Sequence, residues 1–240
     1  MSAIKKITGW IPNSITCCNL LSGCLACIFA FRAYETIGAL RGWQWTCVFI
    51  GAAAVFDFLD GAMARLLKAY SKLGAELDSL SDLVSFGVAP AFLIFNIMGH
   101  FSAEADAQTT WLQYAALAVP VLGALRLARF NVMDVGDVNF HGLPIPSAAI
   151  FLIGVAGWIN DYYYPGNIII AVLTVLIAVA MVGRFRMFSL KFKNFSLRDN
   201  FRRYILLLTA AAFIVMYGLA GFAWTIIFYF LLSVLSRRKI

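Results

Sequence analysis

The sequence predicts an all-α integral membrane protein, folded as a single domain over residues 1–240 with about eight transmembrane helices. Hydrophobic residues make up 62% of the chain and charged residues only 13%, and the mean hydropathy is positive. Soluble domains carry about 25% charged residues, so this chain has too few polar side chains to cover a water-exposed surface. Many of its apolar runs approach the roughly 20 residues that a helix needs to cross a bilayer.

The first residues differ from the apolar runs that follow. Residues 2–10 mix apolar side chains with two lysines, which predicts a short amphipathic helix at the membrane surface. Pro12 follows, and Asn13 or Ser14 is suited to cap the next helix. The apolar runs then predict spans at about residues 14–33, 43–67, 76–98, 111–132, 146–159, 167–182, 204–219 and 222–235.

Basic residues are distributed unevenly over the loops between these spans. With eight spans, both termini and all but two of the 19 Lys and Arg residues fall on one side of the membrane, and only Arg32 and Arg41 fall on the other. Positively charged loops stay in the cytoplasm, so we expect both termini there. A six-span chain, in which the runs at 146–182 or 204–235 form re-entrant hairpins, would satisfy the same charges. The net charge of +7 suits anionic lipid head groups rather than nucleic acid, because the basic residues lie in short loops between apolar runs.

Four of the twelve acidic residues are concentrated at the facing ends of the second and third spans. Asp57 and Asp60 are three residues apart, and Asp78 and Asp82 are four apart, so each pair lies on one face of a helix. Two antiparallel helices joined by the intervening basic turn would bring the four carboxylates together. Such a group needs a cation or bound protons to offset its charge, and oxygen ligands suit Mg²⁺ or Mn²⁺.

Two alternative roles for these aspartates are compatible with their positions. They could form ion pairs with Arg65, Lys68 and Lys72, although a charged residue in a span costs roughly 2.5–3.5 kcal/mol, which favours a functional role. They could also bind ions in a cation transporter. A transporter predicts acidic residues at mid-membrane depth and an internal repeat, and the sequence has no visible repeat.

The spacing of these residues also carries a resemblance. Asp57-x-x-Asp60-Gly61-x-x-Ala64-Arg65 is followed, after eight residues, by Gly74-x-x-x-Asp78-x-x-x-Asp82. This pattern resembles the signature of the CDP-alcohol phosphotransferases, with all eight fixed positions present. The resemblance implies a membrane enzyme with a six-helix core, here extended, that transfers a substituted phosphate from a cytidine diphosphate donor to an alcohol and releases CMP.

The resemblance also implies roles for individual residues. It assigns two Mg²⁺ or Mn²⁺ ions to Asp57, Asp60, Asp78 and Asp82, and it makes Asp82 the catalytic base that takes the proton of the alcohol. Gly61 would let the nucleotide approach the helix closely, and Arg65 is suited to grip a phosphate with two donors. The full set of residues implied to bind the donor is Asn13, Thr16, Gly61, Arg65 and Ser71; for the Asn13–Thr16 segment, helix capping is an equal alternative.

Four longer stretches resemble the bacterial-type phosphatidylserine synthases within this family. They are PNSITCCNLLSG (12–23), LDSLSDLVSFGVAPA (77–91), ALRLARFNV (124–132) and FHGLPIPSAA (140–149). The resemblance implies CDP-diacylglycerol as donor and L-serine as acceptor, in a homodimer of a bacterial inner membrane whose active site faces the cytoplasm. Sibling enzymes that use glycerol 3-phosphate, inositol phosphate or choline are the alternatives.

The acceptor should contact residues outside the signature. Arg126 and Arg129 are three residues apart at the end of the fourth span, on one helix face, and we expect at least one of them to contact either the serine carboxylate or the donor phosphate. Anchoring the span at the cytoplasmic surface is the alternative role for both arginines. Asn131 and His141, in the adjoining loop, are weaker candidates.

Overall fold

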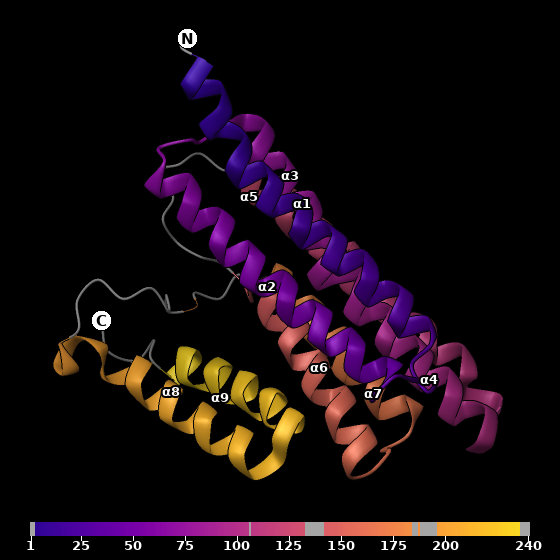
Figure 1. Cartoon of the computed structure of the whole chain (residues 1–240). Coiled ribbons are helices and arrows are strands. Elements are labelled where there is room, and N and C mark those ends of the chain that lie inside the picture. The colour runs from indigo at the N-terminus through magenta and orange to yellow at the C-terminus, as the bar shows by residue number, and fades with distance from the viewer. Residues whose placement is uncertain (1–2, 106, 133–141, 184–186, 188–195, 236–240) are drawn as a thin grey trace.

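The computed structural model describes residues 3–105, 107–132, 142–183, 187 and 196–235, and almost all of them are helical (Figure 1). The all-α class predicted from the sequence is therefore confirmed. The α-helices are α1 (Ala3–Phe31), α2 (Gly42–Leu66), α3 (Lys72–Asp82), α4 (Ala89–Ala105), α5 (Ala118–Val132), α6 (Ile145–Asp161), α7 (Asn167–Val182), α8 (Leu197–Tyr217) and α9 (Gly221–Leu235). Shorter elements are the π-helix η1 (Leu83–Val88), the 3₁₀-helices η2 (Ala107–Leu117) and η3 (Gly218–Ala220), and the strands β1 (Thr36–Ile37) and β2 (Leu40–Arg41).

The first helix does not divide where the sequence suggested. α1 is continuous from Ala3 through Pro12 to Phe31. Residues 3–10 of the segment that was predicted as a separate surface helix therefore belong to the first part of α1. Ser14 Oγ donates to the carbonyl of Trp10 at 3.0 Å, and Thr16 Oγ1 to that of Pro12 at 3.0 Å. The prediction that Asn13 or Ser14 caps a new helix is therefore wrong. Proline is tolerated inside membrane helices where hydroxyl side chains and neighbouring helices satisfy the backbone.

The third predicted span is interrupted directly after its acidic residues. α3 ends at Asp82, and the π-helix η1 carries the chain into α4, with the Ala89 N–H bonded to the carbonyl of Val84. A π-helical turn inserts one extra residue into the helix and is frequent at functional sites. Residue Gly23 of α1 lies against this turn, and a Cβ there would be 2.3 Å from Ser85 Oγ.

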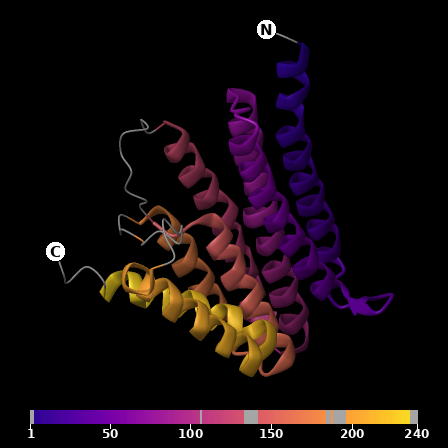
Figure 2. The ribbon, with the colours of Figure 1, turned by 60° about the vertical axis from the view of Figure 1, so that its left-hand side comes forward.

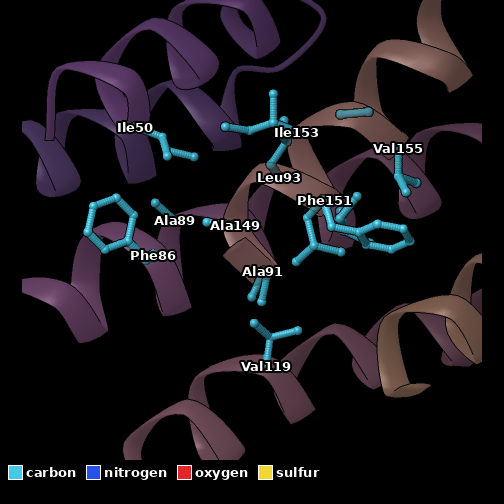
Figure 3. Close-up of a cluster of buried hydrophobic side chains, with 14 of the residues drawn as sticks. Ile50, Phe86, Ala89, Ala91, Leu93, Val119, Ala149, Phe151, Ile153 and Val155 are labelled. Atoms are coloured by element: carbon cyan, nitrogen blue, oxygen red, sulfur yellow. The ribbon is translucent and has the colours of Figure 1, made fainter. Parts of the chain in front are cut away.

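Helix α6 forms the centre of the bundle, and most of its residues are buried. Figure 3 shows Phe151 and Ala149 of α6 among Ile50 of α2, Leu93 of α4 and Val119 of α5, in one apolar cluster. On another part of α6, Gly154 and Gly157 allow α9 and η3 to approach closely. Small residues commonly permit this contact between membrane helices.

Five segments of the described chain are long and apolar enough to cross a membrane: Trp10–Phe31, Gly42–Leu66, Lys72–Ser102, Gln108–Val132 and Asn200–Val234. The last of these reverses direction at Gly218, where φ is +58°, so α8 and α9 lie side by side as a hairpin that runs obliquely to the other helices (Figure 2). α6 and α7 are apolar but shorter. Each of the eight predicted spans is thus helical, in a multi-pass membrane protein.

Candidate active site

The facing ends of α2 and α3 hold three carboxylates in close proximity. Asp57 and Asp60 lie in the last three turns of α2, and Asp78 lies in the middle of α3. Each offers one carboxylate oxygen, and these atoms all lie within 4.8 Å of one another. The sequence predicted that all four carboxylates come together, and the structure brings together Asp57, Asp60 and Asp78. Asp82 is outside that group of three, one helical turn beyond Asp78 at the end of α3.

Helix α1 lies against both α2 and α3 and supplies polar side chains to this centre. Thr16 Oγ1 donates to Asp60 Oδ2 at 2.6 Å, and Asn19 Nδ2 lies 3.5 Å from Asp82 Oδ1. The sequence interpretation paired the two acidic helices directly. In the structure, α1 bridges them, and Thr16 orients a carboxylate in addition to any contact with a nucleotide.

Two of the residues that shape this centre were missed from the sequence. Asn19 is fully buried, and its side-chain oxygen accepts a hydrogen bond of 2.7 Å from the buried Ser85 of η1. A signal was present, because Asn13, Thr16 and Asn19 recur every third residue within an apolar run. That spacing places polar groups on one face of a helix, and such groups are costly in a membrane unless they have partners.

The carboxylates fit a divalent cation better than they fit an ion-pair network. Asp78 Oδ1 is buried and has no hydrogen-bond partner. None of the four aspartates forms an ion pair with any residue that the structure describes, and Arg65, Lys68 and Lys72 are not buried against them. Arg32 and Glu35, in contrast, form an ion pair at 2.6 Å. A buried anionic oxygen without a partner is costly, and oxygen ligands of this kind match Mg²⁺ or Mn²⁺.

The residues predicted to bind the donor differ in burial and in their contacts within the protein. A Cβ on Gly61 would meet nothing within 4 Å, so the space beside that backbone is free. Arg65 is exposed one turn further along α2. Ser71 Oγ accepts the N–H of Gly74 at 2.9 Å and caps α3. Asn13 is buried beside Gly74, where a Cβ would lie 2.9 Å from Asn13 Oδ1.

The two arginines predicted to bind the acceptor have different environments. Arg126 is half-buried, and its Nε is buried without a hydrogen-bond partner. Arg129 is exposed. The Asn131 amide donates to Ser79 Oγ at 3.0 Å and so ties the end of α5 to α3. His141 lies outside the described residues.

Together, the helical bundle and its carboxylate centre define a multi-pass membrane protein with a site suited to divalent cations. Residues 9–184 match the family model described as CDP-alcohol phosphatidyltransferase. The chain therefore belongs to the CDP-alcohol phosphatidyltransferase family. The matched residues include most of α1 and continue through α7, and the α8–α9 hairpin follows them. The alternative of a cation transporter has no support from this match.

Curated relatives in archaea and bacteria are similar over most of the chain. A CDP-diacylglycerol–serine O-phosphatidyltransferase of Methanocaldococcus jannaschii is 34% identical over 76% of this chain and 75% of its own. One of Helicobacter pylori is 32% identical over 82% of this chain and 78% of its own. An archaetidylserine synthase of Methanothermobacter thermautotrophicus is 35% identical over 75% of this chain and 70% of its own.

Proposed function

We propose that this protein transfers the phosphatidyl group of CDP-diacylglycerol to the hydroxyl of L-serine, giving phosphatidylserine and CMP. The observation that carries the proposal is the group formed by Asp57, Asp60 and Asp78, in which Asp78 Oδ1 is buried without a hydrogen-bond partner. Membership of the family supports the reaction type. The names of the relatives support serine as the acceptor.

In this proposal the aspartates have two functions. Asp57, Asp60, Asp78 and Asp82 hold one or, as we expect, two Mg²⁺ or Mn²⁺ ions, which when bound supply the positive charge that stabilises the diphosphate as it is cleaved. Asp82 accepts the proton of the serine hydroxyl. The serine oxygen then forms a bond to the phosphatidyl phosphorus, and the bond from that phosphorus to the oxygen of the CMP phosphate breaks, so CMP leaves with that oxygen.

Other residues of the chain bind and orient the two substrates. Gly61 leaves space for the nucleotide beside α2, and Arg65 binds a donor phosphate; Asn13, Thr16 and Ser71 line the same end of the bundle. Arg126 binds the serine carboxylate, because its guanidinium has a buried N–H without a partner and its helix α5 packs against η1, which begins directly after Asp82. A serine held by that contact would present its hydroxyl to Asp82.

The setting of the enzyme is part of the proposal. We propose that the whole chain is one domain in the cytoplasmic membrane of a bacterium, with the active site and both termini on the cytoplasmic side, where soluble serine is available. Arg65, Lys68 and Lys72 lie near the site, whereas Arg32 and Arg41 lie at the opposite end of α1 and α2. The larger number of basic residues at the site end supports a cytoplasmic site. We also propose a homodimer.

An acceptor panel tests the reaction. Purified protein is incubated with CDP-diacylglycerol, Mn²⁺ or Mg²⁺, and one labelled acceptor: L-serine, glycerol 3-phosphate, inositol phosphate or choline. We expect CMP release and labelled lipid with serine alone. Turnover only with glycerol 3-phosphate would overturn the choice of serine, and the cationic pair Arg126 and Arg129 would then serve a second phosphate. A parallel reaction with an ether-linked donor distinguishes the two lipid types named among the relatives.

A further inference from the structure

We infer that Asn19 is a positioning residue for Asp82, and that Ser85 holds the Asn19 amide in the orientation this requires. The inference rests on the proposed function, in which Asp82 accepts the proton of the attacking hydroxyl. Neither Asn19 nor Ser85 belongs to the acidic signature.

Three side chains form a connected polar chain across the contact between α1 and the α3–η1 segment. Ser85 Oγ lies 2.7 Å from Asn19 Oδ1, and Asn19 Nδ2 lies 3.5 Å from Asp82 Oδ1. Asn19 and Ser85 have no solvent exposure. The hydrogen bond from Asn19 to Asp82 is long. Among the described residues, Asn19 is the one that donates a hydrogen bond to the Asp82 carboxylate, and it does so from the side of α1.

The chemistry of the three groups determines which way the amide points. An ionised carboxylate can only accept hydrogen bonds, whereas a hydroxyl can donate or accept. If the Asn19 amide turned over, its oxygen would face the Asp82 oxygen, and two acceptors would oppose each other. The observed orientation gives Asp82 a donor and leaves the Asn19 oxygen for the Ser85 hydroxyl, which also lies 3.1 Å from the Asn19 carbonyl. Each of the three side chains then has at least one hydrogen-bond partner, as buried polar groups usually do.

The backbone permits this contact through two features. Gly23 has no side chain, and a Cβ there would be 2.9 Å from Ser85 Cα, so α1 and η1 approach more closely than larger residues would allow. The π-helix begins at the residue after Asp82, and this turn carries Ser85 toward α1. The close approach and the helical irregularity thus meet at the residues that hold Asp82.

Replacing Asn19 tests its role. We expect Asn19→Ala to lower kcat with serine at least about tenfold, since a hydrogen bond to a charged group is lost, while the KM for serine and the Kd for CDP-diacylglycerol change less than about twofold. A residue needed only for folding would instead change donor binding and thermal stability together with turnover. Asn19→Asp keeps the shape but replaces the donor with a second acceptor, so its kcat should fall at least as far.

Ser85→Ala is a milder variant, and the chain offers a matched control. Ser81 is equally buried and also donates to an α1 carbonyl, that of Thr16, but its hydroxyl does not contact Asn19. We expect Ser85→Ala to lower kcat about threefold or more and Ser81→Ala to change it less than about twofold. Because Ser85 acts through Asn19, the Asn19→Ala and Ser85→Ala effects should not add in the double variant.

The outcomes separate this inference from the proposed function. If the wild-type protein turns over serine and Asn19→Ala retains its kcat, or if Ser85→Ala and Ser81→Ala behave alike, the positioning role is overturned and the proposed function stands. If the wild-type protein uses another alcohol, the proposed acceptor is wrong, and the same variants test Asn19 on that alcohol. A wild-type protein that releases no CMP with any acceptor overturns both.

Discussion

Arg126 and Arg129 are equivalent in the sequence but not in the fold. Both lie near the end of α5, yet Arg126 is half-buried with an Nε that has no hydrogen-bond partner, and Arg129 is exposed. We predict that Arg126→Ala raises the KM for serine roughly tenfold or more, because a charge-assisted hydrogen bond to the carboxylate is worth about 1.5–3 kcal/mol. Arg129→Ala is the control and should change that KM less than about twofold. Steady-state kinetics with varied serine concentration would measure both KM values. If the two variants change the KM equally, both arginines only anchor α5 at the membrane surface.

The buried oxygen of Asp78 leads to a prediction about metal dependence. Asp78→Asn keeps the size of the side chain but removes one negative charge from the group of three carboxylates. We predict loss of turnover, with an apparent Mn²⁺ affinity lowered by at least about tenfold and normal insertion into membranes. Glu76→Gln is the matched control, because Glu76 lies on the same helix and is exposed. An Asp78→Asn protein with full activity would remove the metal-site interpretation.

At the scale of helices, the contact between α1 and η1 depends on the absence of a side chain at Gly23. A Cβ there would be 2.3 Å from Ser85 Oγ and 2.9 Å from Ser85 Cα, whereas a Cβ on Gly51 would meet nothing within 4 Å. We predict that Gly23→Ala lowers stability by about 1–3 kcal/mol and reduces turnover. Gly51→Ala should be neutral or slightly stabilising, because alanine favours helices. Thermal unfolding in detergent measures both, and equal midpoints would contradict the close contact.

Helices α1 and η1 show which features of this fold the sequence could predict and which it could not. Hydropathy predicted every helix that crosses the bundle, because apolar length is a direct physical requirement of a membrane span. It predicted neither the continuity of α1 through Pro12 nor the π-helix after Asp82. Both depend on hydrogen bonds with neighbouring helices, which periodicity within one segment does not contain. The carboxylate group was predictable from spacing, and the spacing of Asn13, Thr16 and Asn19 placed Asn19 on the polar face of α1, but the contact of Asn19 with Ser85 was not predictable.

At the scale of the whole molecule, α6 and α7 are short for membrane spans. They contain 17 and 16 residues, or about 25 Å of helix at 1.5 Å per residue, against a hydrocarbon core of roughly 30 Å. For α6 the mismatch with lipid is limited, because most of its residues are buried in protein. The N–H of Leu143 also bonds to the carbonyl of Ala180 at 2.9 Å, which joins the start of α6 to the end of α7. These two helices therefore form an antiparallel pair, either spanning or re-entrant.

Cysteine labelling distinguishes those two arrangements and tests the orientation. In a variant without the five natural cysteines, single cysteines replace Thr36 in the α1–α2 hairpin, Tyr163 in the α6–α7 loop or Tyr70 beside the active site, all of which are exposed. A maleimide that cannot cross membranes should label Thr36→Cys and Tyr163→Cys in intact cells, and Tyr70→Cys only after permeabilisation. If α6 and α7 were re-entrant from the cytoplasm, Tyr163→Cys would not be labelled from outside. Labelling of Tyr70→Cys in intact cells would reverse the orientation and separate the site from cytoplasmic serine.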